Sequence, residues 1–184
     1  EVLRGSAAML FGRGQAGGVI NQASKEPGLK DKGSVTATAG SYDYKRLTAD
    51  VNQVLDDTVA LRVNAMKTDA GSSRDHVGSE REGFAPTLRF GMGTGNEITL
   101  AHYYLNTHNT LDYGVPFFSN KPLDVPASRF YGTTADYEDN TTHITTLTYR
   151  HSTSDDSEIK TVLRHADYTR DLWGVAPRLP SGTT

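Results

Sequence analysis

The chain has 184 residues, enough for one domain, and its 19 basic and 22 acidic residues give a net charge of −3. A balance this mild provides no basic surface for nucleic acid, so we expect no nucleic-acid partner. The sequence has no cysteine, which excludes disulfide scaffolds and thiolate metal sites.

The hydropathy of the sequence excludes one kind of membrane protein and permits another. No apolar run approaches the roughly 18–20 residues that a transmembrane helix requires. A membrane β-barrel is compatible with this, because its strands of about 9–11 alternating residues give only weak hydropathy. The sequence opens inside a motif and ends in what reads as a loop, so we interpret it as a fragment.

The opening residues predict a compact glycine-rich unit. Ser6 can cap a short helix over residues 7–11, because its hydroxyl accepts a hydrogen bond from a free amide of the first turn. Glycines end this helix and precede a predicted strand over residues 19–23. A Pro-Gly pair at residues 27–28 then closes the unit. We therefore predict a domain boundary at about residue 28.

Beyond this boundary, seven segments alternate with the period of two that is typical of β-strands. Six of them have a clear apolar face. Its residues are Val35, Ala37 and Ala39; Leu47, Ala49 and Val51; Val59, Leu61, Val63 and Ala65; Phe84, Pro86, Leu88 and Phe90; Ile98, Leu100 and Tyr104, with His102 between them; and Ile159, Thr161 and Leu163. The sixth segment in chain order, residues 143–152, does not sort onto two faces. We expect one antiparallel sheet.

The charges of the clearly alternating segments all fall on the opposite face. That face carries Thr36, Thr38, Thr48, Asp50, Asn52, Arg62, Asn64, Thr87, Arg89, Lys160 and Arg164. A wall between lipid and a polar lumen would give this pattern, because a Lys or Arg facing lipid at mid-membrane costs ~2–4 kcal/mol. A soluble sheet that packs one face on a core gives the same alternation, so the pattern leaves both interpretations open.

The connections between segments alternate between short and long. Short polar ones fall at residues 55–57, 94–96 and 154–157, and long ones at residues 71–82 and 111–142. Outer-membrane barrels alternate tight turns with large loops in this way. A structureless connection of roughly 30 residues is unusual in a compact soluble domain unless it is functional. Pro86 lacks the N–H that a paired strand requires, so we expect a bulge there.

The opening motif contains Glu-Val-Leu-Arg-Gly at residues 1–5, Leu-Phe-Gly at 10–12, Gly-Gly-Val-Ile-Asn at 17–21 and Lys-Glu-Pro at 25–27. These residues resemble the end of the plug domain and the start of the barrel in TonB-dependent outer-membrane receptors, most closely siderophore receptors. The sequence departs from the family pattern at Ser6 and Ala16, where proline is commoner. The segment Phe84–Phe90 resembles a barrel strand of the family, including its proline.

The resemblance implies an all-β fold: a fragment of a 22-stranded transmembrane antiparallel β-barrel with the C-terminal part of a small α+β plug domain. Residues 1–28 would end the plug, and residues 29–184 would form the first seven barrel strands. The implied location is the outer membrane of a Gram-negative bacterium, in contact with its lipid. The implied function is uptake of a ferric siderophore, bound above the plug and by extracellular loops and energised from the periplasmic side by TonB. The TonB-contact segment would lie outside this sequence.

The resemblance also suggests ligand contacts. Phe11 would lie at the plug apex, next to Arg13, a cation suited to an anionic chelate. Tyr113 resembles a tyrosine that lines the pocket of such receptors. Phe117 and Phe118, in the same long connection, are further candidates because aromatic rings stack on planar chelates. The structural alternatives are packing of Phe11 in the plug, a solvated turn for Arg13, and packing of the loop aromatics onto the plug or in the barrel's aromatic girdle.

Arg4 resembles a plug arginine that pairs with glutamates of the barrel wall; alternatively it bonds carbonyls within the plug. The six histidines lack a metal-site spacing with carboxylates, so we expect no metal or cofactor held by protein ligands. The iron would arrive already chelated, as the ferric siderophore. The glycine pattern at residues 12–17 lacks the preceding strand and following helix of a dinucleotide site.

Two other functions stay open at this stage. One is a passive outer-membrane pore, which would explain the strands but not the opening motif. The other is a secreted β-sheet carbohydrate-active enzyme, which would require two carboxylates facing one cleft. Asp50 is the single acidic residue that we place on the interior face of the clear strands, so we nominate no catalytic residue and expect no enzyme.

Overall fold

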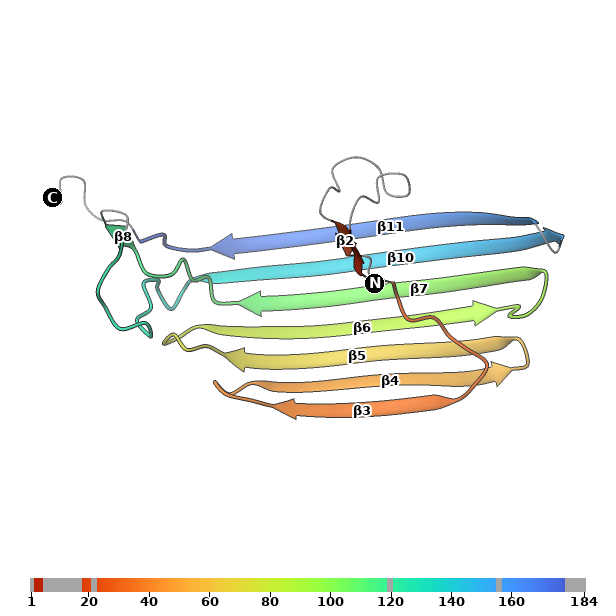
Figure 1. Ribbon diagram of the computed structural model, residues 1–184, viewed down its shortest axis with the longest axis horizontal. Helices are drawn as coiled ribbons and strands as arrows, with labels where there is room; N and C mark the ends of the chain where they lie inside the picture. Colours follow the sequence, from red (N-terminus) through yellow and green to blue (C-terminus); the bar gives the residue numbers. More distant parts are fainter. Residues whose placement is uncertain (1, 5–17, 21–22, 119–120, 155–156, 178–184) are drawn as a thin grey trace.

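The computed structural model describes residues 2–4, 18–20, 23–118, 121–154 and 157–177, and Figure 1 shows its strands. Seven long strands dominate this part of the chain. They are β3 (Lys32–Ala39), β4 (Lys45–Asp56), β5 (Val59–Gly71), β6 (Gly78–Phe90), β7 (Asn96–Asn109), β10 (Tyr137–Ser154) and β11 (Ser157–Trp173). Within the described ranges, no helix is long and apolar enough to cross a membrane.

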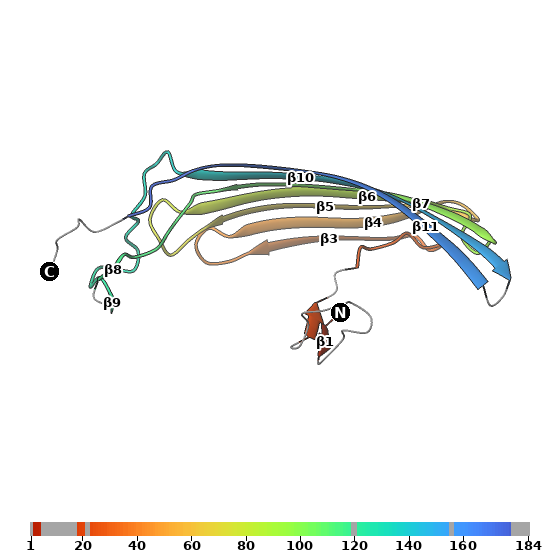
Figure 2. The same ribbon diagram turned by 90° about the horizontal axis from the view of Figure 1, so that it is seen from above.

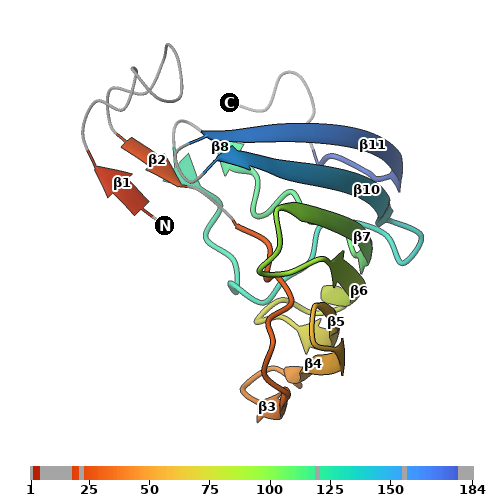
Figure 3. The same cartoon turned by 90° about the vertical axis from the view of Figure 1, so that its right-hand side faces the viewer.

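The seven long strands form one antiparallel sheet in the order β11-β10-β7-β6-β5-β4-β3. Each of the seven predicted segments is one of these strands. The sheet is curved, as Figure 3 shows from its end. Between β7 and β10 the chain forms a small pair of two-residue strands, β8 (Phe117–Phe118) and β9 (Lys121–Pro122).

The long strands extend farther than the sequence pattern indicated. The connection predicted over residues 71–82 is confined to 72–77, because Ser79 to Glu82 remain paired with β5. The connection predicted over 111–142 covers 110–136, since β10 begins at Tyr137. These two predictions were therefore too long. The predicted alternation of short and long connections is confirmed. The tight turns lie at one end of the sheet and the longer connections at the other (Figure 1).

Pro86 does not form the expected bulge. It pairs with Val63 on one side, and on the other side the pairing of β6 with β7 is interrupted between Phe84 and Thr87. The register before and after the interruption is the same, with Phe84 opposite Tyr104 and Thr87 opposite Ala101. The missing N–H therefore interrupts the ladder without inserting a residue.

The apolar face of the sheet is uncovered in the described structure. Val35 is 71% exposed, Leu163 63% and Leu47 53%. One cross-strand row on this face consists of leucines over five strands: Leu61, Leu88, Leu100, Leu147 and Leu163. The polar face shows the opposite behaviour, since Asn52, Arg62, Thr68 and Thr87 are buried. A sheet with this distribution is the reverse of one that packs on a soluble core.

The same apolar face carries a charged row near the long loops. In register across six strands lie Lys45, Asp69, Glu80, His108, Asp139 and Asp171. The prediction that this face bears no charge therefore holds only for the middle of the strands. On β5, Asp69 lies eight residues beyond Leu61, roughly 26 Å along the strand. Because the apolar band of a barrel is about 25 Å tall and its strands are tilted, such a row fits the level of the lipid headgroups.

At the chain start, β1 (Val2–Arg4) pairs antiparallel with β2 (Gly18–Ile20), with Arg4 opposite Gly18. This pair lies beside the sheet, as the view from above shows (Figure 2). The predicted helix over residues 7–11 lies outside the described residues. Residues 23–31 then lead from this unit to the first strand of the sheet.

Candidate functional site

Residues 25–31 dock on the polar face of the sheet. The side-chain amide of Asn52 donates hydrogen bonds to the carbonyls of Gly28 (2.7 Å) and Lys30 (2.9 Å). Its Oδ1 accepts a hydrogen bond of 2.9 Å from the Gly28 N–H. Farther along, Asp31 Oδ1 accepts a 2.6 Å bond from the backbone N–H of Val54. The segment is therefore attached through the backbone of Gly28 and Lys30 and through the side chain of Asp31.

Two ionic contacts strengthen this attachment. Arg62 forks onto Asp50, with Nε–Oδ1 and Nη2–Oδ2 distances of 2.8 and 2.7 Å, and donates from Nη1 to the Glu26 carbonyl at 2.9 Å. Lys25 reaches the same Asp50 carboxylate at 2.8 Å. Because Arg62 is nearly buried, its charge requires this set of partners. The Asp50 carboxylate thus joins the docked segment to the wall.

Arg89 connects the same segment to a strand farther around the wall. Its Nη1 lies 3.1 Å from the Glu26 carboxylate, and its Nη2 pairs with Glu97 on β7. The exposed Glu26 shares this arginine with the half-buried Glu97. Arg89 therefore links the docked segment to β7 through both carboxylates at once.

At the opposite end of the strands, two loops are joined by Arg74. Its Nε lies 2.8 Å from Asp112 Oδ2, and its Nη1 donates a 3.2 Å bond to the Arg129 carbonyl. The next residue, Asp75, donates its backbone N–H to the carbonyl of Ser128 at 2.8 Å. The loop after β5 therefore holds both the beginning and the later part of the long loop before β10.

The predicted ligand residues of the long loop lie at its surface. Tyr113 is 57% exposed and Phe117 68%. Phe118 pairs through its backbone with Lys121, and its side chain lies outside the described part of the structure. Phe11 and Arg13 lie outside the described residues, and of Arg4 only the backbone pairing is described. Their predicted roles stay predictions.

Asp136 fastens the end of the long loop. Its Oδ1 accepts a 2.6 Å bond from the Thr133 hydroxyl, and its Oδ2 accepts bonds from the amides of Thr133 (3.1 Å) and Val175 (3.2 Å). The Thr133 hydroxyl, helped by these two amides, holds the pKa of the Asp136 carboxyl below its usual range. The residue thereby ties the loop to the chain beyond β11.

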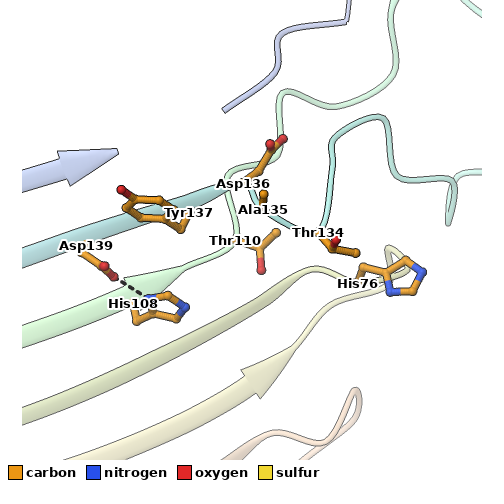
Figure 4. Close-up of a pocket in the computed structure, with 8 residues that line it drawn as sticks. All are labelled: His76, His108, Thr110, Thr134, Ala135, Asp136, Tyr137 and Asp139. Carbon is orange, nitrogen blue, oxygen red and sulfur yellow. Dashed lines mark hydrogen bonds and ion pairs between the residues drawn. The ribbon is translucent and has the colours of Figure 1, made fainter. Parts of the chain in front are cut away.

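A cavity of about 500 Å³ lies next to this fastening point (Figure 4). Its lining is polar and includes His76, His108, Thr110, Thr134, Asp136, Tyr137 and Asp139. His108 pairs with Asp139. His76 has a left-handed backbone (φ +64°), a conformation that non-glycine residues rarely adopt. Of the predicted ligand residues that the structure describes, none lines this cavity.

Sequence reasoning missed several of these residues. Asp50, Asn52, Arg62 and Arg89 were placed on the polar face, but their partners could not be named. The partners of Arg74 gave no signal, because the Arg129 carbonyl that it bonds is 55 residues away in the chain. The charge of Arg74 within a polar connection was the one visible hint.

Comparison with known proteins supplies the relationship. No protein-family model matches the chain. The catecholate siderophore receptor Fiu of Escherichia coli K12 is 36% identical over 188 residues, covering 93% of this chain and 24% of that protein. The probable TonB-dependent siderophore receptor PiuA of Acinetobacter baumannii is 31% identical, covering 94% of this chain and 25% of that protein. The chain thus spans about a quarter of the length of these relatives.

Solved structures agree with the sequence comparison. The crystal structure of the ferric-catecholate import receptor Fiu from E. coli K12, in its open form, gives a TM-score of 0.84 at 33% identity, covering 93% of this chain and 28% of that one. The siderophore receptor PiuA from A. baumannii gives 0.82 at 31% identity, with 93% and 26% covered. Over 93–94% of its length the chain is thus homologous to TonB-dependent siderophore receptors.

These similarities decide whether the apolar face of the alternating strands faces lipid or packs on a soluble core. The sheet is part of a receptor β-barrel of the TonB-dependent family, and its place is the outer membrane of a Gram-negative bacterium. The relatives are transport receptors and not enzymes, which agrees with the expectation from the sequence that the protein is not an enzyme. The uncovered apolar face is then the face that meets lipid, and the polar face with its docked segment is the luminal wall.

Proposed function

We propose that this chain is part of a receptor that takes up a ferric siderophore across the outer membrane, with energy supplied through TonB. The observation that carries the proposal is the 36% identity to the catecholate receptor Fiu over 93% of the chain. The names of the relatives do not favour a passive pore or a carbohydrate-active enzyme. On the same basis we propose a catecholate as the chelate.

We also propose the division of the chain. Residues 1–28 are the last part of the plug, and residues 29–184 are the first seven barrel strands of a longer receptor. The attachment of residues 25–31 to the luminal wall supports this division, because a plug must be continuous with the wall that surrounds it. The bonds from Asn52 to the Gly28 carbonyl and from Arg62 to the Glu26 carbonyl hold the chain at this proposed boundary.

The ligand is proposed to bind at the loop end, where Tyr113 and Phe117 expose aromatic rings. Exposed rings on a loop are costly unless they cover or bind something. Phe130 of the same loop is a different case: a Cβ added to Gly132 would come within 2.3 Å of its ring, so Phe130 folds back on the loop backbone. Tyr113→Ala is therefore expected to weaken chelate binding more than Phe130→Ala. Equal effects of the two substitutions on chelate binding would show that Tyr113 does not line the pocket.

The direct test is growth under iron limitation. A strain that lacks the complete receptor should fail to use ferric catecholates and should recover with the restored gene. Ferric hydroxamates should support the mutant and its parent equally. If no chelate distinguishes the two strains, the uptake proposal is wrong; if hydroxamates alone distinguish them, the catecholate assignment is wrong.

A further inference from the structure

Arg74 makes an unusual set of contacts for a residue in a short connecting loop. Its guanidinium bonds the Asp112 carboxylate at 2.8 Å and the Arg129 carbonyl at 3.2 Å. The side chains of Arg74 and Asp112 are only 23% and 17% exposed. A half-buried, charge-assisted contact of this kind is stronger than an exposed surface pair.

The Asp112 carboxylate has a second task. Its Oδ1 accepts the backbone N–H of Gly114 at 2.9 Å, while its Oδ2 faces Arg74. Gly114 has a φ of +81°, a left-handed conformation that a residue with a side chain rarely adopts. This turn follows Tyr113 directly. The direction in which the Tyr113 side chain points is therefore set by the Asp112 carboxylate, which Arg74 holds.

The same short loop also fixes the far part of the long loop. Asp75 bonds the Ser128 carbonyl, next to the Arg129 carbonyl that Arg74 bonds. Residues 112 and 128–129 are thus held at one point, and the chain between them is closed into a ring. Closing a loop in advance lowers the ordering entropy that a ligand must otherwise overcome when it binds.

We propose that Arg74 is a positioning residue for the ligand: it fixes Tyr113 and closes the long loop without touching the chelate. This inference rests on the proposed function, in which Tyr113 meets the ferric siderophore. Arg74 thereby links ligand affinity to the connection between β5 and β6, which contributes none of the predicted ligand residues.

The experiment uses the complete receptor, purified in detergent and titrated with a ferric catecholate. Arg74→Ala is expected to lower affinity about tenfold, since contacting residues couple by a free energy of this order. Arg74→Lys should recover part of the affinity, because lysine keeps the charge facing Asp112 but not the fork to Arg129. Lys45→Ala, which removes a cation from the outer face of β4, is the control and should bind normally.

Hydrogen exchange of the long loop in the ligand-free receptor separates positioning from direct contact. Arg74→Ala should speed exchange at Gly114 and around residue 129. Weaker binding with unchanged exchange would mean that Arg74 touches the ligand, which overturns the proposal. Unchanged binding and exchange would overturn it as well. If the unmodified receptor binds no ferric chelate, the proposed function fails, and the exchange data still decide whether Arg74 holds the loop.

Discussion

Asn52 pairs with Gly28 as though it were a neighbouring strand: its side-chain carbonyl accepts the Gly28 N–H, and its side-chain NH₂ donates to the Gly28 carbonyl. A side-chain amide has the same donor and acceptor as a peptide group, so it can continue a ladder where no strand is present. Asn52 is only 1% exposed. This side chain therefore anchors Gly28 and Lys30 of the segment that leads into the sheet.

Replacement of Asn52 by alanine should release that segment. The change removes the hydrogen-bond partner of both the N–H and the carbonyl of Gly28, and each such bond contributes about 0.5–1.5 kcal/mol. The amide hydrogen of Gly28 should exchange much faster in Asn52→Ala than in the unmodified receptor. Asn64→Ala, on the same face of β5, is the matched control and should leave that amide protected. Equal protection in both variants would show that Asn52 does not hold the segment.

Arg62 should be sensitive to the loss of its charge. Arg62→Met leaves the Asp50 carboxylate with Lys25 alone among its described partners and leaves the Glu26 carbonyl unbonded. Removal of one member of a buried pair costs about 3–5 kcal/mol, so the midpoint of urea unfolding in detergent should fall clearly. Arg164→Met, on the exposed luminal face of β11, should have little effect. An unchanged midpoint for Arg62→Met would contradict the role assigned to this pair.

Asp136 predicts how the long loop responds to pH. Its pKa is lowered in the folded state, first by the Thr133 hydroxyl, so its contribution to stability is complete above the unfolded pKa of about 3.9. That contribution is lost as the pH falls through the lower folded pKa. The protection of the amides of residues 133 and 175, relative to their intrinsic exchange rates, should therefore persist at pH 5 and fall well below pH 4. In Asp136→Asn the exchange should be faster at pH 5 and should lose this acid-dependent step.

The leucine row predicts where a charge cannot be tolerated. Leu100→Arg places a cation in the lipid-facing band, where the cost reaches ~2–4 kcal/mol at mid-membrane. The fraction of receptor that resists unfolding by detergent before heating should fall. Ala101→Arg adds the same charge on the luminal face, between Thr87 and Thr146, and should be tolerated better. The reverse order of effects would mean that the two faces are assigned wrongly.

The sequence predicted the strands well and their ends poorly. The alternation of apolar and polar residues identified all seven strands, because in the middle of the strands one face meets lipid and the other faces the lumen. Toward the loops the outer face becomes charged, as at Asp69 and Glu80, and the contrast disappears although the ladder continues. The segment 143–152 did not sort for a different reason: its outer face mixes Leu147 and Tyr149 with polar His143, Thr145 and His151, and its luminal face carries Ile144.

The candidate site was predictable only in part. The family resemblance pointed to Tyr113 and the loop aromatics to Phe117; both are exposed in the structure, and their contact with a ligand stays a prediction. The contacts that hold this loop, from Arg74 to Asp112 and Arg129, join loops that lie apart in the chain, and residue pattern has no means of pairing them. The wall contacts of Asn52 were hidden for a related reason, since they involve backbone groups that every residue has.

The measurement that tests the central claim most directly is the accessibility of spin labels along β7 in lipid bilayers. Single cysteines at Ile98, Thr99, Leu100 and Ala101 of the reconstituted receptor would carry the labels. Labels at 98 and 100 should collide with oxygen dissolved in the lipid, and those at 99 and 101 should not. Collisions with a water-soluble nickel complex at 98 and 100, or the absence of any alternation, would contradict the assignment of the apolar face to lipid.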